Sequence, residues 1–193
     1  MIIGITGTIG AGKSSVSNFF KDKGYLVFDT DKMVHAYYEK DAPIYNYLVE
    51  QYGQEILAED KSLNRKALAN LVFNNKSHLA KLESVVFPEV IKEIIEISKK
   101  YSNKVVFVEV PLLFEAQMDE LFDKIIVVDA FRHLRHKRLM AKGLELQDIK
   151  KREQRQLKSL EKKRRGDIII NNNKDIAHLK KLLSKIENGG MLL

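Results

Sequence analysis

The stretch GITGTIGAGKSSVSNFF, residues 4–20, contains the pattern G-x-x-x-x-G-K-[ST] at residues 7–14. In this pattern, backbone N–H groups of a glycine-rich turn surround nucleotide phosphates, and a helix begins where the turn ends. An apolar strand over residues 2–6 precedes the turn, and an amphipathic helix is expected after it. The sequence therefore predicts a nucleotide-phosphate site, but the pattern leaves open where the terminal phosphate goes.

Each part of this loop has an expected role toward ATP. The Lys13 ammonium can reach the β- and γ-phosphates, and the Ser14 hydroxyl can bind Mg²⁺. Lys13 is therefore a candidate catalytic residue, and Ser14 is a candidate metal ligand. The residues expected to bind ATP in and beside the loop are Gly7, Thr8, Ile9, Gly10, Ala11, Gly12, Lys13, Ser14 and Ser15.

Outside the loop, short apolar runs rich in β-branched residues predict four further strands. Such continuous runs are typical of parallel strands that are buried on both faces of a sheet. They cover residues 25–28, 105–108, 124–129 and 167–170. Because helical segments alternate with these strands, the expected fold class is α/β, with a five-stranded parallel sheet flanked by helices.

Two segments between the strands are longer than simple crossovers. Residues 32–101 have helical periodicity, with an interruption expected near Pro88, and are interpreted as a helical substrate lobe. Residues 131–165 are interpreted as a basic lid of two helices with a break near Gly143. The chain is expected to be a single domain. Its core would comprise residues 1–31, 102–130 and 166–193.

Positive charge is concentrated in the expected lid. The 193-residue chain has a formal net charge of +7, and residues 131–165 hold 14 Lys and Arg against 4 Asp and Glu, a net +10. Such a block favours a polyanion, either nucleotide phosphates or nucleic acid, although a solvated helix face explains it equally well. The absence of cysteine excludes disulfides and zinc–thiolate sites. No apolar run reaches the ~20 residues that span a bilayer, and we expect a cytoplasmic protein.

Carboxylates at strand ends are the candidates for proton transfer or metal binding. Ligands of doubly wound sheets gather at the carboxyl ends of the strands, where Asp29 and Asp31 follow the second strand. Asp31 could deprotonate an acceptor hydroxyl, bind Mg²⁺ through water, or do both, while Asp29 either caps a helix or binds Mg²⁺ through water. Glu109, at the end of the third strand, could contact metal-bound water or substrate, or form a local salt bridge. Asp129 is interpreted as structural.

Basic residues in the expected lid recur at helical spacing. Arg135, Arg138 and Lys142 can share one helix face. A phosphoryl-transfer transition state requires cations around its oxygens, and a mobile lid that carries them also excludes water. The five histidines lack the spacing of a metal site and receive no role.

Four stretches together resemble the dephospho-coenzyme A kinase family. Besides the loop stretch at residues 4–20, they are GYLVFDTDKMVH at 24–35, LNRKALANLVF at 63–73 and VPLLFE at 110–115. Weaker matches are DKIIVVD at 123–129, and Gln156 followed by GDIIINNN at 166–173. The loop is shared with many families, whereas Asp-x-Asp followed by V-P-L-L-F-E is specific to this one.

The resemblance implies a P-loop kinase that uses ATP and Mg²⁺. It would phosphorylate the ribose 3′-hydroxyl of dephospho-coenzyme A to give coenzyme A and ADP, the last step of coenzyme A biosynthesis. By the same resemblance, Asp31 is the base on that hydroxyl, and Arg138 and Lys142 are lid residues at the ATP phosphates, with Arg138 also catalytic. The implied substrate-binding residues are Asp31, Arg65, Pro111, Leu112 and Glu115. No membrane and no obligatory nucleic acid is implied, and a monomer is favoured.

Three positions depart from the family's usual pattern. Thr8 stands where glycine is usual, which should matter little if its φ is negative. Phe87 replaces the histidine of a His-Pro pair, and Lys142-Gly143 replaces an Arg-Asp pair. Because lysine lacks the forked geometry of arginine, Arg138 is the stronger candidate at the phosphates.

Two other functions stay open on the residues alone. A kinase for nucleosides or nucleoside monophosphates would have a similar loop and lid but would leave V-P-L-L-F-E unexplained. A nucleic-acid-binding ATPase is supported only by the basic segment 131–165, in which Phe131 is the one aromatic residue available for stacking. A GTPase is excluded because the sequence contains no D-x-x-G.

Overall fold

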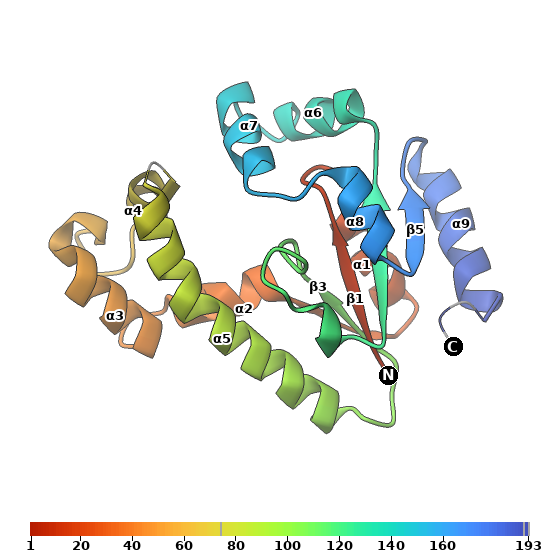
Figure 1. Ribbon diagram of the computed structural model, residues 1–193, viewed down its shortest axis with the longest axis horizontal. Coiled ribbons are helices and arrows are strands. Elements are labelled where there is room, and N and C mark those ends of the chain that lie inside the picture. Colours follow the sequence, from red (N-terminus) through yellow and green to blue (C-terminus); the bar gives the residue numbers. More distant parts are fainter. Residues whose placement is uncertain (74, 191, 193) are drawn as a thin grey trace. The chain divides into compact units, whose positions relative to one another are not determined.

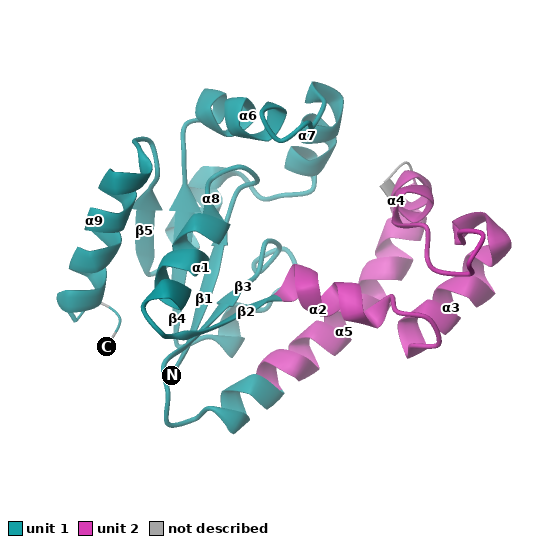
Figure 2. Ribbon diagram, turned by 180° about the vertical axis from the view of Figure 1, so that it is seen from behind, with its two compact units in different colours: residues 1–29, 96–193 teal, residues 30–95 magenta. Residues whose placement is uncertain are grey.

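The structure is a computed structural model that describes residues 1–73, 75–190 and 192 of the chain. The chain divides into two compact units (Figure 2). The first comprises Met1–Asp29 and Glu96–Leu193, and the second comprises Thr30–Ile95. The first unit contains the sheet, and the second is mainly helical. The finer division into core, substrate lobe and lid stays a prediction.

Within the described residues, five parallel strands form one sheet in the order β2–β3–β1–β4–β5 (Figure 1). They are β1 (Ile2–Gly7), β2 (Leu26–Asp29), β3 (Val106–Glu109), β4 (Lys124–Asp129) and β5 (Ile168–Asn171). All six residues of the central strand β1 are buried, as the apolar composition of the run predicts. The expected α/β fold with a parallel sheet is confirmed.

Helices cover both faces of this sheet. On one face, α1 (Lys13–Asp22) and α9 (Ile176–Asn188) pack on inward-pointing strand residues, and Phe20 stacks on Phe107 with ring centroids 4.0 Å apart. The alternate residue Val127 points to the other face. There it meets Gly166, which follows α8 (Ser159–Arg165), so closely that a Cβ on Gly166 would lie 2.4 Å from Val127 Cγ2.

The carboxyl ends of the strands bring the candidate segments to one edge of the sheet. β1 runs into the phosphate loop, and β2 ends at Asp29, which is the Cα partner of Glu109 at the end of β3. A short 3₁₀ helix, η2 (Asp119–Leu121), precedes β4. After β4, the chain forms α6 (Arg132–Met140) and α7 (Leu146–Gln154), which lie near each other in Figure 1.

The segment expected to form two basic helices contains three. The break near Gly143 is present, where φ is 84°, but a separate helix, α8, follows α7. Its first residue, Ser159, donates its hydroxyl to Asp129 Oδ1 at 2.6 Å, and Lys163 forms an ion pair with the same carboxylate at 3.0 Å. These contacts join residues about thirty positions apart, so helical periodicity could not reveal them.

Residues at the helix ends of the second unit determine where several of its helices begin and end. Its elements are α2 (Thr30–Tyr37), α3 (Pro43–Tyr52), the 3₁₀ helix η1 (Gly53–Ile56), α4 (Arg65–Phe73) and most of α5 (Lys76–Lys100). Pro43 begins α3 with a φ already suited to a helix, and Gly53, with φ of 65°, ends it. Asn64 caps α4, because its Oδ1 accepts the backbone N–H of Ala67 at 3.0 Å.

The interruption expected near Pro88 was wrong, since α5 runs continuously from Lys76 to Lys100. Proline removes one backbone hydrogen bond and usually kinks a helix. Here Val86, Val90 and Ile94 are buried at intervals of four residues on one face. Burial on both sides of the proline offsets the lost hydrogen bond, so the helix continues.

Candidate functional site

Glycine is required at two ends of the phosphate loop. Gly7 and Gly12 have φ of 145° and 103°. A Cβ on Gly7 would lie 2.0 Å from the Val128 carbonyl oxygen, and one on Gly12 would lie 2.2 Å from Asn172 Nδ2. By contrast, Thr8 is not among the described non-glycine residues with positive φ. The condition under which threonine should matter little there, a φ that is not positive, is therefore met.

The start of α1 and one lysine add positive charge to the loop. α1 begins at Lys13 with Gly12 as its N-cap residue, so its first backbone N–H groups face the loop. The Lys13 side chain folds back, with Nζ 3.1 Å from Gly7 O and 3.4 Å from Thr8 O. The buried ammonium is thus held at the loop, where bound phosphates would meet it.

Glu109 joins the end of β3 to the helix that follows the loop. Its Oε1 accepts the Ser14 hydroxyl at 3.1 Å, and its Oε2 accepts the Ser17 hydroxyl at 2.7 Å. Burial raises the pKa of Glu109, and the nearby Asp29 adds to the rise, while the Ser17 hydroxyl and the Lys13 ammonium oppose it. The strand-end carboxylate therefore contacts the hydroxyl that the sequence assigned to a metal.

This corner of the sheet offers the oxygen donors that Mg²⁺ prefers. Ser14 and Glu109 are in contact, and Asp29 occupies the neighbouring strand position beside Glu109. Kinases bind Mg²⁺ through one or two protein oxygens together with substrate phosphates, rather than in an all-protein cage. A hydroxyl with one or two carboxylates fits such a site.

Asp31 and Arg65 both belong to the second unit. Asp31 is exposed in the first turn of α2, where a carboxylate is favourable near the helix N-terminus. Arg65 is exposed and is the first residue of α4. Their assignments, as base and as substrate-binding residue, stay predictions.

Of the two lid residues assigned to ATP, Arg138 contacts the loop. Its Nη1 donates to Ala11 O at 3.4 Å, and its Nη2 donates to Asn172 O at 2.9 Å. The Asn172 side chain itself donates to Ala11 O at 2.8 Å, so these groups form a compact set behind the loop. Lys142, beyond the end of α6, is exposed.

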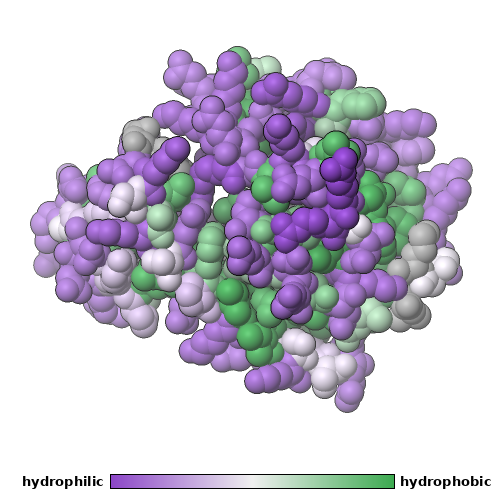
Figure 3. All heavy atoms as spheres, in the orientation of Figure 1, coloured by the Kyte–Doolittle hydropathy of each residue, from purple (hydrophilic) through white to green (hydrophobic). Residues whose placement is uncertain are grey.

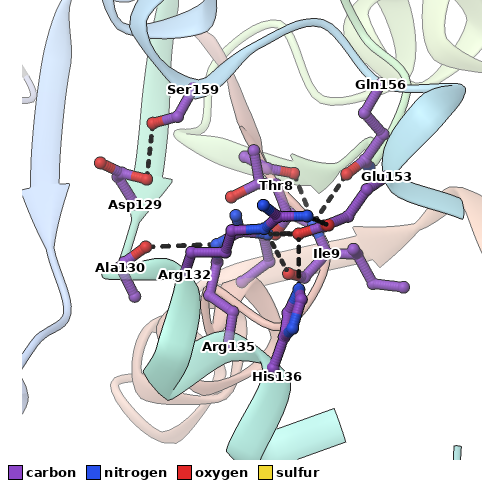
Figure 4. A network of polar contacts seen from close by, with 12 residues as sticks. Thr8, Ile9, Asp129, Ala130, Arg132, Arg135, His136, Glu153, Gln156 and Ser159 are labelled. Carbon is purple, nitrogen blue, oxygen red and sulfur yellow. Dashed lines mark hydrogen bonds and ion pairs between the residues drawn. The ribbon is translucent and has the colours of Figure 1, made fainter. Parts of the chain in front are cut away.

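A single carboxylate joins α6 to α7 beside the loop (Figure 4). Glu153 of α7 contacts three α6 side chains, Arg132 at 3.0 Å, Arg135 at 2.8 Å and His136 at 3.1 Å. Burial favours a higher pKa for Glu153, but the hydrogen bonds from His136 and Arg132 and the charge of Arg135 hold the pKa below its ordinary value. Sequence reasoning missed this cluster, because one acid in a basic run is typical of a solvated face.

The segment VPLLFE is joined to α8 by a buried ion pair that the sequence did not reveal. Lys162 is 0% exposed, and its Nζ lies 3.0 Å from Glu115 Oε1 and 3.0 Å from Pro111 O. Glu115 Oε1 also accepts the backbone N–H of Leu157 at 2.7 Å. Leu112 is half-buried. Lys162 lies in the run Lys-Lys-Arg-Arg, which gives no sign that one of its members is buried.

Comparison with known proteins decides the family. The family model for dephospho-CoA kinases matches residues 1–178. The chain belongs to the dephospho-CoA kinase family. A dephospho-CoA kinase from Aquifex aeolicus (strain VF5) is 36% identical over 185 residues, which cover 95% of this chain and 94% of the relative.

Solved structures agree with dephospho-CoA kinase membership. A protein from Thermus thermophilus is 32% identical with a TM-score of 0.83, covering 98% of this chain and 97% of its own. The dephospho-CoA kinase from Campylobacter jejuni is 29% identical with a TM-score of 0.71, covering 98% of both chains. The resemblance inferred from the four stretches is confirmed, and the chain is a kinase of coenzyme A biosynthesis that uses a nucleotide.

Proposed function

We propose that the enzyme transfers the γ-phosphoryl group of ATP to the ribose 3′-hydroxyl of dephospho-coenzyme A, giving coenzyme A and ADP. The observation that carries this proposal is the family match over residues 1–178, in a chain whose phosphate-loop pattern is complete at every fixed position. Phosphoryl transfer also requires cations, oxygen donors and a base; the loop and α6 would supply the cations, the ends of β2 and β3 the oxygen donors, and Asp31 the base.

The loop and the groups behind it are proposed to bind the ATP phosphates. Loop N–H groups and the Lys13 ammonium would contact the β- and γ-phosphates. Arg138 would stabilise the negative charge of the transition state. Its guanidinium already lies against Ala11 O and Asn172 O, so it needs little reorganisation. Lys142 would contribute only after movement of the exposed segment that carries it.

The proposed magnesium ligands are Ser14, Glu109 and Asp29. Bound there, Mg²⁺ would neutralise charge on the phosphate oxygens. Glu109 holds the Ser14 hydroxyl in place through its Oε1, and the second hydrogen bond, from Ser17, fixes the carboxylate itself. Glu109 is thus added to Ser14 and Asp29, the two metal ligands that the sequence suggested.

The residues proposed to accept the substrate are those that the family resemblance assigned. Asp31 would take the proton of the 3′-hydroxyl as its oxygen attacks the γ-phosphorus. Arg65 would bind an anionic part of the substrate. Pro111, Leu112 and Glu115 would shape its site, and the engagement of Glu115 with Lys162 favours a role in fixing the backbone of this segment.

An acceptor panel tests the reaction. ADP formation, followed by a coupled assay, is expected with dephospho-coenzyme A and not with nucleosides or nucleoside monophosphates. Asp31→Asn is expected to lower kcat by roughly 10²- to 10⁴-fold, whereas Asp41→Asn, at another exposed aspartate of the second unit, should leave it unchanged. Near-normal turnover in Asp31→Asn would overturn the assignment of the base.

The protein is further proposed to act as a cytoplasmic monomer without obligatory nucleic acid. No helix among the described residues is long and apolar enough to cross a bilayer. The surface over α6 and α7 is mostly hydrophilic (Figure 3), yet Arg132 and Arg135 are paired with Glu153. Because these arginines are paired within the protein, less positive charge is left to bind a polyanion such as nucleic acid. Light scattering should give the mass of one chain, and duplex DNA at physiological salt should not bind.

A further inference from the structure

One residue of the phosphate loop, Ile9, is held at both of its backbone polar groups by residues outside the loop (Figure 4). The Ile9 backbone N–H donates to Gln156 Oε1 at 2.7 Å. The Ile9 carbonyl oxygen accepts from Arg135 Nη1 at 3.1 Å. Because one contact acts on each end of the amino-acid unit, the two together restrict the rotation of the loop at its tip.

Both holding groups are themselves fixed. Arg135 is 8% exposed, and it also donates to Ala130 O at 3.2 Å and to Glu153 Oε1 at 2.8 Å. Gln156 follows α7, and its backbone N–H donates to Glu153 O at 3.1 Å.

The next residue along the chain is anchored as well. The Leu157 N–H donates to Glu115 Oε1 at 2.7 Å, and Glu115 is paired with the buried Lys162. The Gln156 side chain therefore projects from a backbone that is tied on both sides, through Glu153 and through Glu115.

The loop needs such external support because its own sequence gives it little rigidity. Gly7, Gly10 and Gly12 all have positive φ, and glycine has more backbone freedom to lose than any other residue. A phosphate cradle works only if its N–H groups are already aimed when the anion arrives. Holding Ile9, which lies between Gly7 and Gly10, therefore lowers the ordering cost of binding.

We propose that Gln156 is a positioning residue for nucleotide binding. By accepting the Ile9 N–H, its carboxamide turns this amide away from the phosphates and so aims the neighbouring loop amides at them. It touches no reacting atom. This inference deepens the proposed function, on which it rests for the identity of the nucleotide, and it assigns a role to a residue at which the sequence showed only a weak family match.

The test compares three full-length variants. Gln156→Met removes the acceptor while keeping the side-chain length, and Gln156→Glu keeps an acceptor. Gln154→Met is the matched control, since Gln154 is exposed at the end of α7. Binding of ATP is measured by calorimetry without acceptor substrate, exchange of the Ile9 amide proton by NMR, and KM for each substrate by steady-state kinetics.

Gln156→Met should weaken ATP binding and raise KM for ATP by roughly two- to tenfold, the effect of losing one hydrogen bond. KM for dephospho-coenzyme A should stay the same, and the Ile9 amide should exchange faster. Gln156→Glu should keep the Ile9 amide protected, and Gln154→Met should match wild type in every measurement.

Unchanged ATP binding in Gln156→Met would overturn the inference, and so would weaker binding with unaltered Ile9 exchange. Failure of the proposed function would look different. Wild-type enzyme would then bind ATP but form no ADP with dephospho-coenzyme A, and the binding and exchange measurements on Gln156→Met would still decide the role of Gln156.

Discussion

Removing one partner of the Glu115–Lys162 pair is expected to destabilise the protein more than removing both. Lys162 is fully buried, and its Nζ contacts Glu115 and Pro111 O. Lys162→Met keeps most of the volume but leaves the Glu115 carboxylate, whose side chain is 13% exposed, with the Leu157 N–H alone. Glu115→Leu leaves a buried ammonium against one carbonyl oxygen.

The magnitude follows from the burial of the pair. Removing one partner of a buried ion pair costs about 3–5 kcal/mol, out of a total of about 5–15 kcal/mol for a typical protein. The double variant has no buried charge at this position. It leaves the Leu157 N–H without its partner, whereas the Pro111 carbonyl keeps the Thr6 hydroxyl at 3.5 Å, and new apolar contacts offset part of the loss. We therefore expect the double variant to be more stable than either single variant.

Urea denaturation followed by circular dichroism at pH 7 measures the four free energies of unfolding. Lys92→Met is the control, because its ion pair with Glu89 is at the surface, with the two side chains 68% and 50% exposed, and should change stability by less than about 1 kcal/mol. Losses that simply add in the double variant would refute the reasoning, since independent residues behave in that way.

The pH dependence gives a second check on the same pair. Burial lowers the pKa of Lys162 from 10.5, and Glu115 opposes part of that shift. Below pH 10.5 the unfolded chain therefore binds more protons at this lysine than the folded one, so stability rises as the pH approaches 10.5 from below. Lys162→Met should lose this rise.

Three further substitutions test the site. Burial raises the pKa of Glu109 above 4.5, so the folded state binds more protons there than the unfolded state. Stability should therefore fall as the pH rises from 4.5 through the folded pKa. Glu109→Gln should flatten this fall, measured by urea denaturation at several pH values. Thr8→Val removes a buried hydroxyl that has no hydrogen-bond partner, and should raise the free energy of unfolding by up to about 1 kcal/mol, measured by urea titration. Gly12→Ala places a Cβ 2.2 Å from Asn172 Nδ2 at a φ of 103° and should cost about 1–3 kcal/mol from the backbone alone, with weaker ATP binding in calorimetry.

Local signals were enough to predict the sheet and the position of the phosphate loop. The apolar runs correspond to the observed strands, and the loop follows β1 as its pattern requires. Asp29 and Glu109 could be assigned to the same edge, because parallel strands end together. These inferences depend on residues that are neighbours in sequence or on the rule that parallel strands share a direction.

Contacts between distant segments could not be predicted. Nothing local distinguishes Lys162 from the basic residues around it, although it is the one held by Glu115, 47 positions earlier. Gln156 contacts Ile9 across 147 positions, and Pro88 stays within a helix because of packing that the local pattern does not contain. Residue type limits which hydrogen-bond and ion-pair partners a side chain can have, but the tertiary structure determines which of them lies within reach.

The position of β1 at the centre of the sheet has a consequence for synthesis on the ribosome. β1 pairs with β3 and β4, so Ile3 meets Phe107 on one side and Lys124 on the other, both more than a hundred residues later in the chain. At about 5–20 residues per second, the ribosome needs roughly 5 to 25 seconds to make the intervening chain. During that time, both edges of an apolar strand lack their partners, which is the state that invites aggregation. Chaperones should therefore bind the nascent chain mainly at this strand, and this binding should end once β4 has emerged from the ribosome.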